Sequence, residues 1–378
     1  MIVEYRFSSP EGDIPLSSED LNKSFKITLQ KEHPVLTLGD YFKVLQEFIL
    51  AHNRDYLTDL IGATGIEKLI IRSEKHGALY HIASIDLFHG EETKRFALCS
   101  AVTETGRNSL RHEFEIITNL NRETNLHYLP RTYCLTDIIS SYDDKMPPIL
   151  VTLMEWFEDY HEWHLQEDES SRQQRVIIWD QQNGYRFASD YEAREIYKQA
   201  AKIITLYYDF TSHRHIHPWH HAAGDFIVKT KDKIELKLTT ARGYDSIMDH
   251  WGADNIIPMT AAVYFFLNLT VRMRLDRQDG TGKLLWADER FINPVIDGFL
   301  ESWVMKGNEE TELSDELKKL PDLLKSFSSD ELEKLLYSLL PIYEKEDSEE
   351  FAIIKNNLPQ HALDLYKSLK SNTGPILE

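Results

Sequence analysis

Residues 213–229, HRHIHPWHHAAGDFIVK, place five histidines within nine positions, ahead of a glycine-aspartate turn and an apolar strand. Imidazole binds zinc, manganese and iron, and a histidine near its ordinary pKa can act as a general base. His217, His220, His221 and Asp225 could therefore supply three or four metal ligands. No H-x-x-x-H or H-E-x-x-H motif on a predicted helix supports a metal site here, and histidines packed within a rigid loop would give the same pattern. A metal site, a catalytic loop and a packed cluster all remain open.

Composition limits the partners. The chain has 378 residues and a formal net charge of −20, with 42% hydrophobic and 28% charged residues. These fractions are ordinary for a soluble globular protein, and the length suggests two or three domains. Because the acidic charge repels phosphate backbones and anionic membrane surfaces, we expect neither a nucleic-acid nor a membrane partner. The oligomeric state stays open.

Cysteine usage and apolar stretches predict a cytoplasmic protein. Cys99 and Cys134 are the only cysteines, and both lie in apolar surroundings, which favours reduced thiols. The first residues, MIVEYRFSSPEGD, show no basic region ahead of an apolar one, so we expect no signal peptide. Residues 256–271 form the longest apolar stretch, which is too short for a membrane span and predicts a buried helix.

The first half of the chain predicts an α+β organisation. Residues 1–61 form an extension whose segment 39–60 has apolar side chains at the spacing of one amphipathic helix. Residues 62–156 show three strands, a helix and two strands, which is typical of a lobe with an antiparallel sheet. The buried face of that helix should contain Leu110, Phe114, Ile117 and Leu120.

Residues 157–378 are predicted to be mainly helical. Asn183-Gly184 predicts a tight hairpin within an insertion, and Ser189 with Glu192 forms the capping box of a long helix. The histidine loop follows this helix directly. Further helices complete the C-terminal region.

This order of elements, with the segment WHHAAGDFIV, resembles the protein kinase-like fold over roughly residues 66–300. The nearest branch is that of the aminoglycoside and choline phosphotransferases, in which the corresponding loop reads G-D-L-H-P-G-N-F-L-V. The resemblance implies two lobes, a small one with an antiparallel sheet and a mainly helical one. It also implies ATP bound in the interlobe cleft with a divalent metal, Mg or Mn rather than Zn.

The resemblance assigns roles to individual residues. Lys75 and Gly77 lie in the turn expected over the nucleotide phosphates, and Glu113 fits the helix glutamate that pairs with a phosphate-binding lysine. Glu155 and Trp156, in LVTLMEWF, match the segment whose backbone docks adenine. Each pattern also has an ordinary explanation as a hairpin turn, a surface charge or a buried strand.

Three positions depart from the phosphotransferase pattern together. Cys99 stands where the strand lysine belongs, His220 where the catalytic aspartate belongs, and Thr240 at the second metal aspartate. Asp225 alone matches a metal-ligand position, and one carboxylate is a poor cage for magnesium. A threonine cannot neutralise the charge that develops on a transferred phosphoryl group.

Three hypotheses follow from these departures. The first is a kinase-fold protein, degenerate in catalysis, that binds a nucleotide or a small ligand. The second is an active atypical ATP-dependent phosphotransferase acting on a small cationic molecule, with chemistry rebuilt around His220, His221, Asp225, Lys75 and Arg242. The third is a metal-dependent module that uses the histidine loop.

Overall fold

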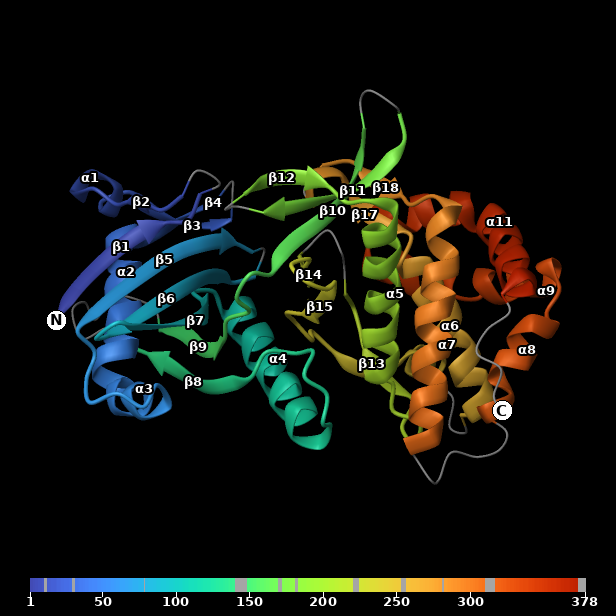
Figure 1. Ribbon diagram of the computed structural model, residues 1–378, viewed down its shortest axis with the longest axis horizontal. Coiled ribbons are helices and arrows are strands. Elements are labelled where there is room, and N and C mark those ends of the chain that lie inside the picture. Colours follow the sequence, from blue (N-terminus) through green and yellow to red (C-terminus); the bar gives the residue numbers. More distant parts are fainter. Residues whose placement is uncertain are drawn as a thin grey trace. The chain divides into compact units, whose positions relative to one another are not determined.

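The computed structural model describes residues 1–9, 12–28, 31–77, 79–139, 148–168, 172–180, 183–219, 224–252, 256–280, 282–309 and 317–372. The chain divides into two compact units (Figure 1). The first contains residues 1–158 and 181–184, and the second contains residues 159–180 and 185–378. The expected extension, residues 1–61, belongs to the first unit.

Within the described residues, seven strands of the first unit form one sheet in the order β2-β1-β5-β6-β7-β9-β8. Neighbouring strands are antiparallel except β1 and β5, which run parallel from Ile2↔Lys68 to Phe7↔Ser73. The α+β class is therefore confirmed, but the sheet is mixed rather than antiparallel, because the N-terminal strand joins it. The strands are β1 (Ile2–Phe7), β2 (Ile14–Pro15), β5 (Lys68–His76), β6 (His81–His89), β7 (Glu92–Ala101), β8 (Thr132–Ile138) and β9 (Ile149–Glu155).

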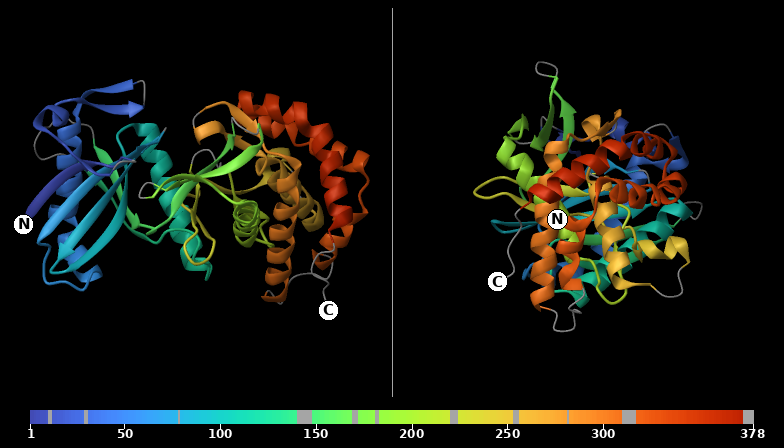
Figure 2. Two further views of the ribbon diagram at one scale, coloured as in Figure 1. Left: turned by 45° about the horizontal axis from the view of Figure 1, so that its top comes forward. Right: turned by 90° about the vertical axis from the view of Figure 1, so that its right-hand side faces the viewer.

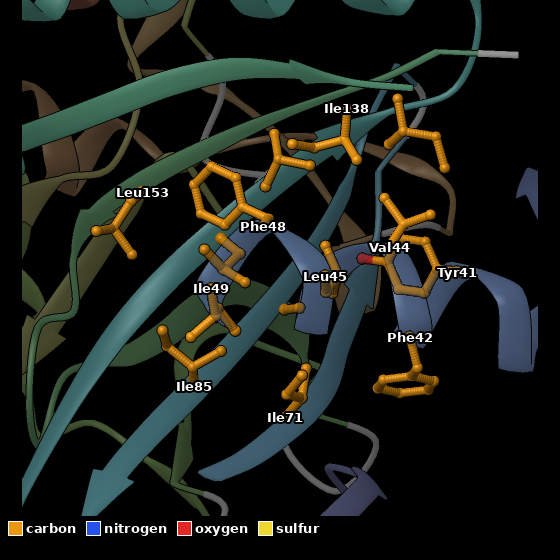
Figure 3. Close-up of a cluster of buried hydrophobic side chains, with 14 of the residues drawn as sticks. Tyr41, Phe42, Val44, Leu45, Phe48, Ile49, Ile71, Ile85, Ile138 and Leu153 are labelled. Atoms are coloured by element: carbon orange, nitrogen blue, oxygen red, sulfur yellow. The ribbon is translucent and has the colours of Figure 1, made fainter. Parts of the chain in front are cut away.

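One face of this sheet is covered by α2 (Leu38–Glu47), and Figure 3 shows the resulting apolar core. Side chains alternate along a strand, so Ile71, Ile85 and Leu153 all face this helix. The segment predicted as one helix is interrupted. A π-helical turn (Phe48–His52) precedes α3 (Arg54–Leu60), because Asn53 leaves helical dihedral angles and its side-chain amide donates to the Phe48 carbonyl at 2.9 Å.

The other face is partly covered by α4 (Glu104–Glu123), which packs on β7, β8 and β9. Its buried row contains Leu110, Glu113, Ile117 and Leu120. Phe114, predicted to be buried, is only half-buried, and Glu113 takes its place. Before this region the chain also forms α1 (Ser18–Leu21) and the hairpin of β3 (Ser24–Thr28) and β4 (Lys31–Thr37).

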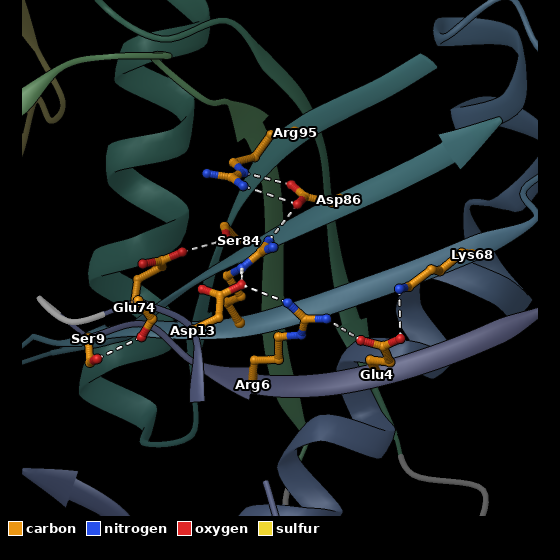
Figure 4. A network of polar contacts seen from close by, with 11 residues as sticks. Glu4, Arg6, Ser9, Asp13, Lys68, Glu74, Ser84, Asp86 and Arg95 are labelled. Carbon is orange, nitrogen blue, oxygen red and sulfur yellow. Dashed lines mark hydrogen bonds and ion pairs between the residues drawn. The ribbon is translucent and has the colours of Figure 1, made fainter. Parts of the chain in front are cut away.

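A network of alternating charges crosses β1, β5, β6 and β7 (Figure 4). Asp86 is buried between Arg72 at 2.7 Å and Arg95 at 2.6 Å, and Arg72 also contacts Asp13 at 2.6 Å. Burial opposes the ionised form of Asp86, but the two guanidinium groups outweigh it and lower its pKa. The network continues through Arg6, Glu4 and Lys68. It thus links the N-terminal segment to the sheet by charge as well as by strand pairing.

Among the described residues, a second sheet has five strands in the order β12-β11-β10-β14-β15. These strands belong to the second unit, except that Gly184, the first residue of β12, is assigned to the first unit. They are β10 (His161–Glu167), β11 (Gln174–Asp180), β12 (Gly184–Phe187), β14 (Phe226–Lys229) and β15 (Glu235–Leu238). Two smaller pairs are β13 (Arg214–Ile216) with β16 (Tyr244–Ser246), and β17 (Leu275–Arg277) with β18 (Leu284–Trp286). The predicted hairpin between β11 and β12 is confirmed, and Gly184 there has a φ of 92°.

Helices build the rest of the second unit (Figure 2). The predicted capping box is confirmed, because Ser189 and Glu192 exchange hydrogen bonds at the start of α5 (Asp190–Leu206). The apolar stretch is indeed a buried helix, α6 (Pro258–Arg272), and no described helix is long and apolar enough to cross a membrane. The remaining helices are α7 (Ile292–Glu309), α8 (Leu320–Ser326), α9 (Ser329–Tyr337), α10 (Leu340–Glu346) and α11 (Ser348–Ser371).

Candidate functional site

The histidine loop of the second unit runs from the end of α5 to β14. Its first part is β13, which pairs with β16 in the register His215↔Asp245. The peptide bond between His217 and Pro218 is cis. His220 and His221, candidate base and metal ligands, lie outside the described residues. The catalytic role of His220 therefore stays a prediction.

Asp225, directly before β14, forms a bidentate ion pair with Arg242. Nη1 and Nη2 of Arg242 donate to the two carboxylate oxygens, each at 2.6 Å. Such paired, charge-assisted hydrogen bonds are among the strongest in proteins. The Asp225 side chain is 2% exposed and that of Arg242 is 29% exposed, so the carboxylate is the buried partner.

Backbone contacts fix the two chain segments that carry this ion pair. The Thr239 amide donates to the Asp225 carbonyl at 2.7 Å, and its hydroxyl donates to the Gly224 and Asp225 carbonyls. Gly243 approaches the other side of the loop, where a Cβ would lie 2.4 Å from the His217 carbonyl oxygen. These contacts fix the backbone on both sides of Arg242 and so hold its guanidinium beside Asp225.

The described residues around Asp225 do not fit the magnesium site that the resemblance implies. A guanidinium engages both Asp225 oxygens, and Thr240, at the second position, is buried without offering a carboxylate. Among the described residues, no group of three or more His, Cys, Asp or Glu side chains could hold a metal ion. Magnesium requires several oxygen ligands in octahedral geometry, and this arrangement does not provide them.

His217, a candidate metal ligand, contacts the C-terminal helices. Its Nε2 lies 2.7 Å from Oε1 of Glu346 at the end of α10. Arg272, at the end of α6, pairs with the same Glu346 and with Glu350 of α11, the latter at 2.8 Å. Arg272 is 3% exposed, and its guanidinium lies 5.0 Å from the Tyr343 ring centroid. This network attaches α10 and α11 to the histidine loop.

The first histidines of the loop belong to the core. His215 is buried against the rings of Tyr208 and Phe265, and burial lowers its pKa to about 3, so it is neutral at physiological pH. Burial also lowers the pKa of His213, whose Nδ1 lies 3.2 Å from the Tyr208 hydroxyl. For these two, packing explains the histidine pattern.

In the first unit, Lys75 and Gly77 belong to a tight hairpin between β5 and β6. Lys75 was expected in the turn, but it lies within β5 opposite Ile82. The Gly77 amide donates to the Tyr80 carbonyl at 3.0 Å, and a Cβ on Gly77 would lie 2.6 Å from that oxygen. Close approach of the two strands therefore explains this glycine.

Glu113 and Cys99 lie in the layer between α4 and the sheet. Glu113 is 5% exposed and accepts a hydrogen bond from the Tyr80 hydroxyl at 2.7 Å. Cys99 packs with Tyr80 on the same face, and burial, with a smaller contribution from the Glu113 charge, raises its pKa to about 12. Both cysteines of the chain are free. A neutral thiol at this position supplies no cation to Glu113.

Glu155 is the last residue of β9, and Trp156 follows it directly. The Glu155 amide donates to the Arg131 carbonyl at 2.9 Å, so this donor is already used within the unit. The Trp156 backbone makes no hydrogen bond with the described residues. The Arg95 guanidinium, paired with Asp86, lies 5.7 Å from the Trp156 ring centroid.

Sequence reasoning named Arg242 but missed its pairing with Asp225, and it missed a second polar cluster entirely. His164 is fully buried between Glu162 at 3.5 Å and Asp276 at 3.7 Å. The alternation of HEWHL, which puts Glu162 and His164 on one face of β10, was the available signal. Asp276 lies 112 residues after His164 in the chain, and no sequence pattern indicated that the two residues meet.

Comparison of the chain with protein-family models and with the sequences of curated proteins gave no match.

Proposed function

We propose that the chain is a protein kinase-like protein, degenerate in catalysis, that binds a nucleotide or a small ligand. The observation that carries the loss of catalysis is the Asp225–Arg242 ion pair, which occupies the one carboxylate left at a metal-ligand position. An internal cation takes the place of the divalent metal. Together with Thr240, this leaves no carboxylate cage for a metal–phosphate complex in the part of the loop that the structure describes.

The element order supports the kinase-like part of the proposal. The strands β5, β6 and β7 are followed by α4 and then by β8 and β9, and they lie in the order β5-β6-β7-β9-β8. This resembles the small lobe of kinases, in which the last two strands exchange places beside the helix. The second unit adds a helix, α5, a loop and the β14–β15 hairpin, in the order that the resemblance requires.

The nucleotide-binding part is supported by the end of β9. Trp156 is the position whose backbone would bind the adenine edge, and its backbone groups are not used by the described residues. Lys75 is the lysine of the β5–β6 hairpin that would cover the phosphates. A small-molecule ligand with the same hydrogen-bonding edge would satisfy this arrangement equally.

Thermal unfolding of metal-stripped protein tests the proposal. ATP in excess chelator should raise Tm, because a ligand that binds the native state stabilises it by RT ln(1 + [L]/Kd). Adding Mg²⁺ or Mn²⁺ should not enlarge the shift, and Asp225→Asn should preserve it. A shift that needs metal and Asp225 together would favour the active phosphotransferase. A shift with metal alone would favour the histidine loop as a metal module, and no shift with ATP would reject nucleotide binding.

A further inference from the structure

The turn between β11 and β12 places an asparagine directly before a glycine. Asn183-Gly184 is the only Asn-Gly pair in the chain. Asn183 lies in the turn and is exposed, and Gly184 is the first residue of β12, with a φ of 92°. Hairpin turns favour Asn and Gly because both tolerate a positive φ. The same pair also has a covalent chemistry that the turn does not require.

The chemistry joins the backbone nitrogen of the glycine to the side-chain carbonyl carbon of the asparagine. The new C–N bond closes a five-membered succinimide ring, and the side-chain nitrogen leaves as ammonia with the proton that the backbone nitrogen loses. Water then adds to either ring carbonyl and opens the ring. One opening gives aspartate, and the other gives isoaspartate, in which the main chain runs through the former side chain. The reaction consumes only water and needs no oxidant, reductant or cofactor.

The fold leaves this reaction unhindered at the turn. Outside the two neighbouring residues, no described heavy atom lies within 4 Å of the position that a Cβ of Gly184 would take. Because glycine itself has no Cβ, its nitrogen can approach the preceding side chain without a steric penalty. The exposure of Asn183 also allows water to reach the ring. The turn therefore combines the reactive sequence with access for both steps.

Other asparagines of the chain are in less reactive surroundings. Asn53 is 8% exposed, and its side-chain amide donates to the Phe48 carbonyl at 2.9 Å. Asn268 is 2% exposed, and its side-chain oxygen accepts from the Tyr343 hydroxyl at 2.9 Å. Asn125 is exposed and lies outside helices and strands, but a leucine follows it. Asn125 is thus the comparison in which exposure is kept and the glycine is missing.

We infer that Asn183 is a site of spontaneous deamidation, at which the folded chain slowly acquires isoaspartate and aspartate. Asparagine is among the thermolabile residues of proteins. Each product adds a negative charge to the turn, and isoaspartate adds one methylene to the main chain. The strand that follows is held in place, since Tyr185 stacks on Trp179 with centroids 5.4 Å apart and Arg186 pairs with Glu192 at 2.6 Å. The modification therefore lengthens the turn of an anchored hairpin.

Peptide mapping by mass spectrometry tests the inference on the full chain. The folded protein is incubated at physiological temperature in mildly alkaline buffer made with oxygen-18-labelled water, and circular dichroism checks that it stays folded. Trypsin then separates the two asparagines into peptides 176–186 and 123–131. Asn183 should take up one labelled oxygen about tenfold or more faster than Asn125, because the leucine after Asn125 hinders attack. Equal rates at the two positions would overturn the inference.

Two controls show where and in which state the reaction occurs. Asn183→Gln has a longer side chain that closes a six-membered ring less readily, so it should abolish labelling of peptide 176–186. Asn125→Gln is the matched control and should leave that labelling unchanged. Labelling that persists in Asn183→Gln would place the reaction at another residue. A chain unfolded in urea is incubated in parallel, and if Asn183 converts there but stays intact in the folded chain, the hairpin protects it and the inference is wrong.

Discussion

Replacing Arg242 by glutamine should destabilise the second unit strongly. The substitution leaves the Asp225 carboxylate, 2% exposed at its side chain, without the two hydrogen bonds that hold its charge. Breaking a buried ion pair by removing one partner costs about 3–5 kcal/mol. Because Arg242 is itself 29% exposed, water can reach part of the vacated space, so we expect a loss of about 2–3 kcal/mol.

Urea unfolding followed by tryptophan fluorescence measures this loss. Six of the seven tryptophans lie in the second unit, the exception being Trp156, so the signal reports mainly on that unit. The double variant Asp225→Asn/Arg242→Gln should regain most of the stability, since the uncompensated charge is gone. Arg277→Gln, which breaks an exposed pair with Glu349, is the control and should cost under about 1 kcal/mol. An Arg242→Gln variant as stable as the unaltered chain would show that the ion pair does not stabilise the second unit.

Three other substitutions test individual features. Burial lowers the folded-state pKa of His215 to about 3, whereas in the unfolded chain this histidine takes up a proton as pH falls through about 6.5. Acid therefore favours the unfolded chain. Between pH 7 and pH 5 in urea titrations, the free energy of unfolding of the unaltered chain should fall by about 2 kcal/mol more than that of His215→Leu. Gly224→Ala should lower the free energy of unfolding by about 1–3 kcal/mol, because Gly224 has a positive φ and an added Cβ would meet Glu162. The loss should exceed that of Gly252→Ala, since Gly252 also has a positive φ but has open space around its Cβ position. Equal losses would show that the Glu162 contact is unimportant. Ser189→Ala should lower stability by about 1 kcal/mol through the lost helix cap, and an unchanged Tm would contradict that assignment.

Local patterns predicted the elements well where one physical signal dominated. Apolar periodicity, the Ser189 capping box and the Asn183-Gly184 turn each depend on neighbouring residues, and the structure confirms the elements they predicted. The helix at residues 39–60 was wrong in its continuity. Its apolar spacing continues past Asn53, and only the side-chain bond to Phe48 shows the break.

The candidate site was harder to predict because its partners come from distant segments. The pairing of Asp225 with Arg242 depends on how the β14–β15 hairpin returns the chain to the loop. The contact of His217 with Glu346 joins residues 129 positions apart. Burial of Glu113 in place of Phe114 likewise depends on the sheet beneath α4 and not on helical spacing alone.

The most direct test of the proposed function is equilibrium dialysis of ATP labelled at the γ-phosphate, performed in excess chelator and again with Mg²⁺, with the chemical state of the label analysed afterwards. We expect ATP to bind with similar affinity in both conditions and the label to be recovered as intact ATP. Binding that requires Mg²⁺, or transfer of the label from ATP, would contradict a degenerate protein whose metal position is filled by Arg242.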